Sequence, residues 1–340
     1  MMFDVNYKPA PKGAWNGRID SECDFDAYRW HQWIKNIDLN KTDLGIYSGK
    51  LGIAFIGYCS DEGIKINKGR TGAAKGPDSI RKELANLPCS FTQEVELFDA
   101  GNIFSENYTV EESQKLLSRA VERILDLNLF PVVLGGGHEI AFGHFDGILN
   151  HLTIHNDKPR IGIINFDAHF DIRPYSNGGS SGTAFRQISD LTRQKGQKYS
   201  YFCIGIQRHS NTTNLFKTAR ELNVDYILAK DITDKSDWSV FESMDDFMKL
   251  QDHIYITICC DVFSSAYAPG VSAAQPLGLD PEIVLKLIKY IVKSNKAVSF
   301  DIAEVSPRFD QDNITASLAS VLIFALVNCL ARIQGLYLQN

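Results

Sequence analysis

The stretch Ile161-Gly-Ile-Ile-Asn-Phe-Asp-Ala-His-Phe-Asp171 decides the fold and points to the site. Its apolar first half predicts a buried strand of a parallel sheet. If the chain stays extended, Asp167, His169 and Asp171 occupy alternate positions and point to one face. Two carboxylates and an imidazole in a buried place are costly to desolvate without a cation. Carboxylate and imidazole ligands suit Mn, Fe, Co or Zn. The alternative is that these residues form an exposed polar turn after the strand and bind no metal.

The surrounding sequence predicts one open parallel sheet. From residue 51 onward, short apolar strand-like runs alternate with amphipathic helical patterns, without a linker or a repeat. This alternation is typical of an α/β domain whose sheet is covered by helices on both faces. Residues 1–50 have no clear period, so we expect an N-terminal extension packed on a single domain of residues 51–340. Functional side chains of such sheets gather beyond the carboxyl ends of the strands.

A second motif, Leu134-Gly-Gly-Gly-His138, follows the strand-like run Pro131–Leu134. Three glycines allow a sharp turn and a close approach of the backbone, which leaves His138 at the mouth of the strand. Alone, this motif is weak, and a plain structural turn explains it better than a functional site does. Together with the aspartates and histidine that follow the next strand, it favours a metal site.

Two later strands also end in polar side chains. Tyr255-Ile-Thr-Ile-Cys-Cys-Asp-Val-Phe263 places Cys259 and Asp261 at alternate positions, and Ser299-Phe-Asp-Ile-Ala-Glu-Val-Ser-Pro307 places Glu304 late in its strand. An aspartate after a strand is often a helix cap, and Glu304 could equally be a structural ion-pair partner facing solvent. The repeated pattern at successive strand ends favours a shared site.

The candidate ligands are sufficient for two metal ions that share a carboxylate. They are His138, Asp167, His169, Asp171 and Asp261. A metal pair activates water for attack on an electron-poor carbon or phosphorus, and the ligand set alone does not distinguish these reactions.

Composition restricts the remaining possibilities. The chain has 340 residues, a net charge of −6 and no basic run, so nothing recruits nucleic acid or an acidic membrane surface. The N-terminus has no signal pattern, and the longest apolar run, within Ala316–Leu330, is interrupted by polar residues and predicts a buried helix. Seven cysteines without a CxxC pattern are typical of a reducing compartment. We therefore expect a cytoplasmic protein that binds neither nucleic acid nor membrane.

The order of these motifs resembles the ureohydrolase family, which includes arginases and agmatinases, over about residues 51–332. The resemblance implies a three-layer α/β/α fold with a mostly parallel sheet of about eight strands. It also implies two Mn(II) ions and hydrolysis of a C–N bond in a small amidine or guanidine. His138 and Asp171 would hold one ion, His169 and Asp261 the other, and Asp167 would bridge them. Assembly as a homo-oligomer, a trimer or hexamer, is implied by the resemblance as well.

The loops 67–77, 181–187 and 268–272 most resemble the branch of that family that hydrolyses N-formimidoyl-L-glutamate. Arg173 and Arg208 stand where arginases have uncharged or acidic residues, and a guanidinium favours substrate carboxylates. Asp167 and Glu304 are the expected catalytic residues, with Glu304 also holding the cationic formimidoyl group. Hydrolysis of a guanidino acid, or a non-catalytic binding role, remains an alternative.

Two positions depart from the family pattern. Cys259 stands where family members commonly have a metal-bridging aspartate, and a thiolate favours Zn, Fe(II) or Co over Mn. We include Cys259 among the metal ligands, with a buried, non-ligating thiol as the alternative. Ser181 stands where arginases and agmatinases have a histidine that transfers protons. A serine at this position argues against arginase and agmatinase activity. It also leaves the group that donates a proton to the leaving group unassigned.

Overall fold

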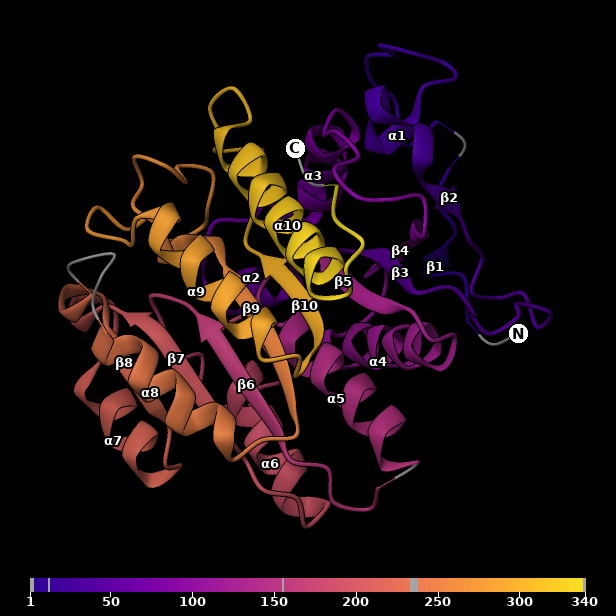
Figure 1. Cartoon of the computed structure of the whole chain (residues 1–340). Helices are drawn as coiled ribbons and strands as arrows, with labels where there is room; N and C mark the ends of the chain where they lie inside the picture. The colour runs from indigo at the N-terminus through magenta and orange to yellow at the C-terminus, as the bar shows by residue number, and fades with distance from the viewer. Residues whose placement is uncertain (1–2, 12, 155, 233–237, 339–340) are drawn as a thin grey trace.

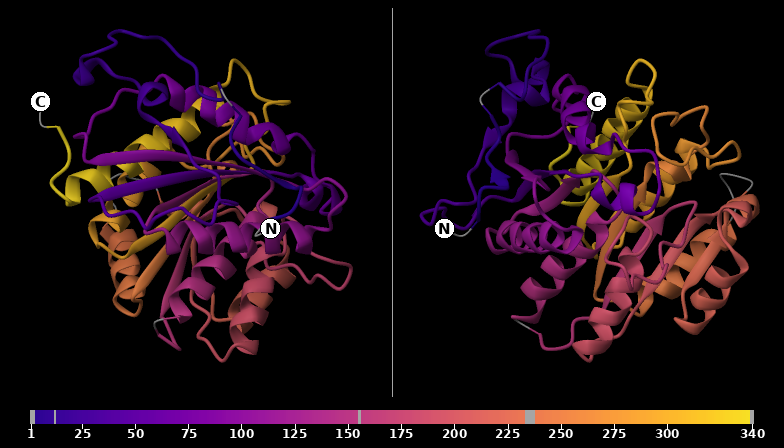
Figure 2. Two further views of the ribbon diagram at one scale, coloured as in Figure 1. Left: turned by 90° about the vertical axis from the view of Figure 1, so that its right-hand side faces the viewer. Right: turned by 180° about the vertical axis from the view of Figure 1, so that it is seen from behind.

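The computed structural model describes residues 3–11, 13–154, 156–232 and 238–338, and within them one twisted sheet of ten strands runs through the molecule (Figures 1 and 2). Its order is β1-β4-β3-β5-β10-β9-β6-β7-β8, with β2 paired to β4. The strands are β1 Tyr7–Lys8, β2 Lys35–Asn36, β3 Leu51–Cys59, β4 Val95–Phe104, β5 Phe130–Leu134, β6 Ile161–Phe166, β7 Tyr201–Ile206, β8 Asp225–Leu228, β9 His253–Cys259 and β10 Ala297–Ala303.

The strands from β3 to β10 pair in parallel throughout, which confirms the predicted parallel sheet of about eight strands. The two remaining strands are only two residues long and come from the N-terminal segment. β1 is antiparallel to β4, and β2 is parallel to it. The N-terminal segment therefore extends the sheet at one edge.

Helices cover both faces of the sheet, as predicted. The α-helices are α1 Trp30–Trp33, α2 Glu62–Ile66, α3 Gly76–Ala85, α4 Val110–Asp126, α5 Ile140–Thr153, α6 Ala184–Gln194, α7 Thr213–Glu221, α8 Trp238–Lys249, α9 Pro281–Lys293 and α10 Ile314–Ile333. Buried side chains of α3, α8, α9 and α10 form one apolar cluster with the sheet, and those of α4, α5, α6 and α7 form the other. The result is a three-layer α/β/α architecture.

Local sequence signals fix several helix ends. Thr109 caps α4 and exchanges hydrogen bonds with Glu112 in a capping box, as the Thr-x-x-Glu pattern predicts. Asp280 caps α9, whose first residue is Pro281. Helix α10 is long and apolar enough to cross a membrane by length and composition, but 72% of its apolar window is buried inside the protein. It packs against α3 and α9 as a core helix.

Aromatic side chains attach the first fifty residues to the domain. Trp30 is fully buried and contacts Phe55 of β3 and Phe91. The indole of Trp15 donates a hydrogen bond to the buried carboxylate of Asp99 at 2.7 Å. The described part of this segment therefore shares the core of the domain.

Candidate functional site

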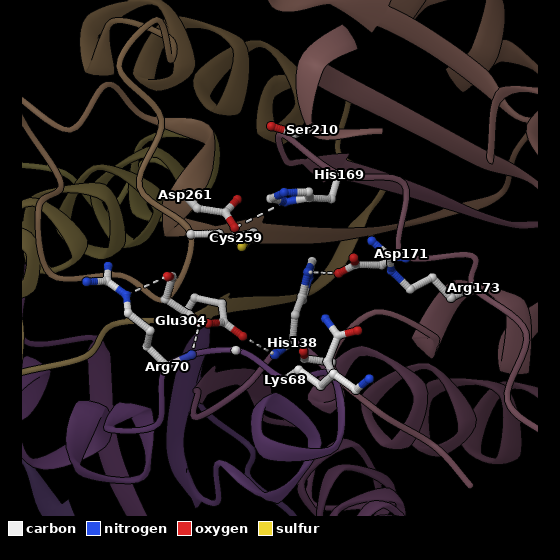
Figure 3. Close-up of a pocket in the computed structure, with 15 residues that line it drawn as sticks. Lys68, Arg70, His138, His169, Asp171, Arg173, Ser210, Cys259, Asp261 and Glu304 are labelled. Atoms are coloured by element: carbon white, nitrogen blue, oxygen red, sulfur yellow. Dashed lines mark hydrogen bonds and ion pairs between the residues drawn. The ribbon is translucent and has the colours of Figure 1, made fainter. Parts of the chain in front are cut away.

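A pocket of about 330 Å³ opens beyond the carboxyl ends of the central strands (Figure 3). Six segments that follow strands β3, β5, β6, β7, β9 and β10 contribute to it, as expected for a parallel sheet. The lining residues are Asn67, Lys68, Gly69, Arg70, His138, His169, Asp171, Arg173, Ser181, Ser210, Cys259, Asp261, Ser272, Ala273 and Glu304. Most of the predicted site residues are therefore brought together in one cavity.

The glycine turn after β5 is packed too closely for side chains. A Cβ atom on Gly136 would lie 1.8 Å from the carbonyl oxygen of Ser60. The same turn is tied to the end of β10, because Glu304 N–H donates to the Gly136 carbonyl at 2.8 Å and His138 N–H donates to Glu304 Oε1 at 3.1 Å. These contacts place the imidazole of His138 and the carboxylate of Glu304 beside each other, as the predicted close approach requires.

The side chains after β6 converge by a different geometry from the predicted extended chain. The strand ends at Phe166, and Asp171 has a left-handed backbone with a φ of 47°. Asp167 Oδ1 accepts a hydrogen bond from His169 N–H at 2.7 Å, which folds the loop around the carboxylate. The expectation of an alternating extended run was therefore wrong, although its conclusion that the three side chains meet is correct.

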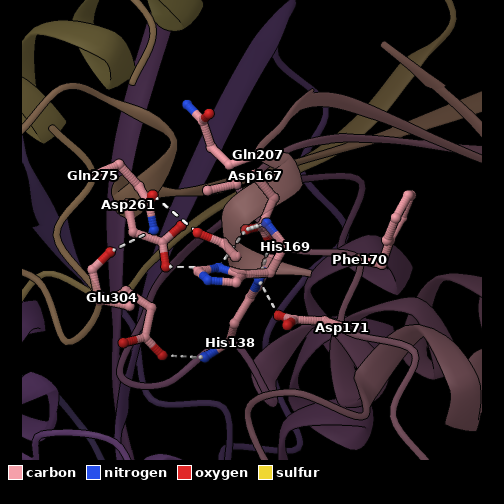
Figure 4. Close-up of polar contacts among 12 residues, drawn as sticks. His138, Asp167, His169, Phe170, Asp171, Gln207, Asp261, Gln275 and Glu304 are labelled. Carbon is pink, nitrogen blue, oxygen red and sulfur yellow. Dashed lines mark hydrogen bonds and ion pairs between the residues drawn. The ribbon is translucent and has the colours of Figure 1, made fainter. Parts of the chain in front are cut away.

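Two groups of candidate ligands share Asp167 (Figure 4). In the first, His138, Asp167 and Cys259 have ligand atoms within 4.8 Å of one another, and His169 and Asp261 join Asp167 in the second. His138 Nδ1 lies 2.9 Å from Asp167 Oδ2, and His169 Nδ1 lies 3.2 Å from Asp261 Oδ2.

Asp171 completes the first group. Its Oδ2 atom lies 3.0 Å from His138 Nδ1. Both oxygen atoms of the Asp167 carboxylate are therefore used, Oδ2 toward His138 and Oδ1 toward His169. This arrangement suits two cations that share one carboxylate.

The electrostatics of the site indicate a place built for positive charge. Burial alone would lower the pKa of His138, but the two adjacent aspartates raise it well above its usual value. Burial would raise the pKa of Asp167, but His138 and His169 hold it below its usual range. Burial and the charge of Asp167 raise the pKa of Asp171 to about 6, and burial with nearby carboxylates raises that of Glu304 well above normal. A bound cation would relieve this crowding of buried carboxylates.

Cys259 lies at the end of β9 with its sulfur among the candidate ligands. The side chain is buried, and burial together with nearby carboxylates raises the pKa of its thiol well above normal. A metal ion would have to displace the thiol proton to bind sulfur. The adjacent Cys260 does not line the pocket and is packed in the apolar core.

A buried hydrogen-bond chain behind His138 orients its ring. His138 Nε2 lies 3.0 Å from Thr257 Oγ1, and Thr257 Oγ1 donates to Asp301 Oδ1 at 2.6 Å. Because the Thr257 hydroxyl donates to Asp301, its oxygen accepts a hydrogen bond from the N–H at His138 Nε2. Asp301 also accepts hydrogen bonds from Tyr255 and His144. The chain assigns the proton to Nε2 and directs Nδ1 toward the candidate metal position.

Glu304 faces the pocket and not solvent. Its side chain is 4% exposed, and Oε2 has no hydrogen-bond partner among the described residues. The sequence left open whether the Glu304 side chain faces the pocket or solvent. A buried carboxylate oxygen without a partner is available to a cationic ligand.

The two predicted substrate arginines lie in different environments. Arg173 lines the pocket; its backbone N–H donates to the Gly182 carbonyl at 3.0 Å, and its guanidinium has no hydrogen bond or ion pair to the described residues. Arg208 does not line the pocket, because the loop after β7 directs its guanidinium over the ring of Phe216, 5.2 Å from the centroid. Gln275 holds this loop by accepting a hydrogen bond from Ser210 at 3.0 Å. The geometry gives no support to the prediction that Arg208 contacts substrate.

Several pocket residues were not identified as site residues from the sequence. Asn67, Lys68 and Arg70 come from the loop that follows α2, and Ser272 and Ala273 come from the loop after β9. Both loops contribute to the family resemblance, which was the available signal. Loop residues of this kind have no strand or helix period that would predict their direction.

Comparisons with known proteins bear on the family and the fold of the chain. The family model described as the arginase family matches residues 51–328. The chain is 65% identical over 336 residues to a formimidoylglutamase from Clostridium tetani, covering 98% of this chain and 99% of that protein. It resembles the crystal structure of a formimidoylglutamase from Bacillus subtilis, with a TM-score of 0.76, 23% identity and coverage of 92% and 94% of the two chains.

A second solved structure shares the fold. It is a formiminoglutamase from Trypanosoma cruzi, described with Mn²⁺, and matches with a TM-score of 0.73 and 24% identity. The match covers 84% of this chain and 97% of that one.

Proposed function

The chain belongs to the arginase family, and from that premise we propose that it hydrolyses N-formimidoyl-L-glutamate to L-glutamate and formamide. One observation carries the proposal: two ligand groups that share Asp167 form the floor of a pocket. The rim of the pocket holds Lys68 and Arg173, whose cationic groups have no ion-pair partner in the part of the chain that the structure describes. The floor suits metal-assisted attack on an amidine carbon, and the rim suits a substrate with carboxylates. The names of the similar proteins support the same reaction, which would serve histidine degradation.

We propose that the pocket holds two Mn(II) ions. His138 and Asp171 would bind one, His169 and Asp261 the other, with Asp167 between them. Crowded buried carboxylates and a histidine ring directed by Thr257 fit such a pair. When bound, a metal pair lowers the pKa of water and polarises the group that is attacked.

The side chains of the pocket would position the substrate. Glu304 presents a free carboxylate oxygen that can hold the cationic formimidoyl group against the floor. Arg173 would bind a substrate carboxylate with paired N–H donors. The oxygen of water is transferred to the formimidoyl carbon, the bond to the glutamate nitrogen breaks, and that nitrogen takes a proton. The products are formamide and L-glutamate.

The identity of the metal depends on Cys259. If its sulfur binds an ion, the site should favour Zn or Fe(II); if the thiol stays protonated, an Mn site is retained. The experiment is release of formamide and glutamate after dialysis against a chelator and addition of Mn, Zn or Fe(II) separately. Comparison of wild-type protein with Cys259→Ser then tests the sulfur directly, because only a ligating thiol should change the metal preference.

The proposal predicts turnover of N-formimidoyl-L-glutamate and none of L-arginine, agmatine or 4-guanidinobutyrate. Turnover of 4-guanidinobutyrate alone would replace the proposed reaction by hydrolysis of a guanidino acid. Absence of both turnover and stoichiometric transition metal would favour a binding role. A cytoplasmic homo-oligomer, trimeric or hexameric, remains the expected state, which sedimentation of the purified protein tests.

A further inference from the structure

The two cations contributed by the loop after α2 lie in contrasting environments. Arg70 is tied to the protein: its Nε atom donates to the Ser272 carbonyl at 2.9 Å, its Nη2 atom donates to the Val271 carbonyl at 2.7 Å, and its guanidinium stacks on Phe309. Lys68 lines the same pocket, yet its ammonium has no hydrogen bond or ion pair to any described residue. Arg70 therefore shapes the pocket, whereas the charge of Lys68 is available.

The backbone of Lys68 is in a conformation that lysine disfavours. Helix α2 ends in a double turn in which Lys68 N–H donates to the Lys65 carbonyl and Gly69 N–H donates to the Ile64 carbonyl. The residue at the position of Lys68 is left-handed, with a φ of 62°, and glycine is the usual residue there. The fold thus gains nothing from a lysine at this position, which points to a role for its side chain.

Lys68 belongs to a polar corner of the pocket. A Cβ atom on Gly182 would lie 3.0 Å from Arg173 Cδ and 3.0 Å from Asn67 Oδ1, so the loops after α2 and after β6 meet at this glycine. Arg173, Asn67 and the hydroxyl of Ser181 also line the pocket without a side-chain hydrogen bond to the described residues. Figure 3 shows Lys68 beside His138, with Arg173 on the right of the view and Arg70 on the left.

Charge is separated across this cavity. The carboxylates of Asp171, Asp261 and Glu304 line the floor. The cationic groups of Lys68 and Arg173, which pair with no carboxylate of the described segments, belong to the rim. A substrate with a cationic head and two carboxylates matches both parts. One cation at the rim would leave the second carboxylate without a partner.

We propose that Lys68 binds one of the two carboxylates of the substrate and that Arg173 binds the other, so that Lys68 determines specificity for a dicarboxylate. This inference rests on the proposed function. It gives Lys68 the role that the sequence assigned to Arg208. The ammonium makes a single-point contact, whereas the guanidinium can bind in a bidentate manner.

The test compares Lys68→Gly and Lys68→Met with the control Lys65→Met, in metal-loaded full-length protein. Lys65 is exposed, pairs with Glu62 at 3.3 Å and does not line the pocket. Both Lys68 variants should raise KM for N-formimidoyl-L-glutamate about tenfold with little change in kcat, and Lys65→Met should change neither. Calorimetric binding of glutarate, a plain dicarboxylate, should weaken by the same factor in the Lys68 variants.

Stability and substrate analogues separate this role from a structural one. Lys68→Gly should unfold at the same or a higher temperature than wild type, because glycine relieves the left-handed backbone. Of the two analogues that each lack one carboxylate, N-formimidoyl-4-aminobutyrate and N-formimidoyl-2-aminobutyrate, one should be insensitive to Lys68→Gly.

The two proposals fail in different ways. Unchanged KM and unchanged glutarate binding in the Lys68 variants, with turnover intact, would overturn the role of Lys68 alone. An equal loss on the full substrate and on both analogues would also overturn it. Absence of turnover by wild-type protein, with glutarate binding that still depends on Lys68, would overturn the proposed reaction and retain the dicarboxylate site.

Discussion

The floor and the rim of the pocket are built on different principles. On the floor, the side chains of His138, Asp167 and Asp261 are buried, follow strand ends and contact other candidate ligands. On the rim, Lys68 and Arg173 come from loops and are exposed, and their charged groups have no partner among the described residues. The buried carboxylates of the floor thus need bound cations to balance their charge, and the cationic groups of the rim need a ligand to pair with. Substitutions on the floor should therefore cost more activity than those on the rim.

The largest effect is expected for Asp167→Asn. Its carboxylate belongs to both ligand groups, so its loss should weaken both metal sites. We expect metal content well below two ions per chain and a fall in kcat/KM of more than about 10³-fold, since the metal pair provides several kcal/mol of transition-state stabilisation. Elemental analysis and the formamide assay measure both. Asp126→Asn, on the far helix α4, is the control. If Asp167→Asn retained two ions per chain and activity within tenfold of wild type, the proposed difference between floor and rim would be wrong.

On the rim, Arg173→Met should mainly affect binding. Removal of paired hydrogen bonds to a carboxylate should raise KM by about 10- to 100-fold, because hydrogen bonds to charged groups contribute ~1.5–3 kcal/mol. Metal content should stay unchanged, which distinguishes this variant from Asp167→Asn. Initial-rate kinetics with N-formimidoyl-L-glutamate measure the effect. If Arg173→Met lost metal instead, Arg173 would support the metal-binding side chains of the floor and not the substrate.

Behind the floor, Thr257→Val removes the hydroxyl that orients His138. We expect about tenfold weaker metal binding, since partners that orient a ligating histidine typically contribute 10- to 100-fold in affinity. Thr257→Ser keeps the hydroxyl and should bind metal nearly as wild type does. Calorimetric titration of the metal-free variants with Mn²⁺ or Zn²⁺ measures the difference in affinity. Equal affinity in the Val and Ser variants would show that the hydrogen-bond chain through Asp301 does not orient the ring.

The smallest effect is expected for Arg208→Met. Its guanidinium packs over Phe216 away from the pocket, so KM should change by less than about twofold, as is usual for an exposed charge. The kinetic assay used for Arg173→Met applies without change. A tenfold increase in KM would return Arg208 to the substrate site and would mean that its loop rearranges when substrate binds.

The sequence was most informative where a motif follows a strand of regular period. The ends of β5, β6, β9 and β10 could be predicted, and parallel strands necessarily bring their carboxyl ends to one edge. The local geometry after Phe166 could not be predicted, because the period of two applies only while the chain remains extended. The rim could not be predicted either, since the direction of Lys68 and Arg208 depends on loop turns and on a glycine contact made by a distant segment.

By itself, the sequence determined the strand–helix alternation, the capping of α4 and α9, and the set of candidate ligands at four strand ends, because these depend on local period and residue chemistry. The tertiary structure decided that Asp167 belongs to both ligand groups, that Glu304 faces the cavity, and that Thr257 supports His138. It also decided that Lys68 and not Arg208 joins Arg173 at the rim. These outcomes depend on contacts between distant segments, such as those of His138 with Asp171 and Glu304, which are 33 and 166 residues away, and no local pattern encodes them.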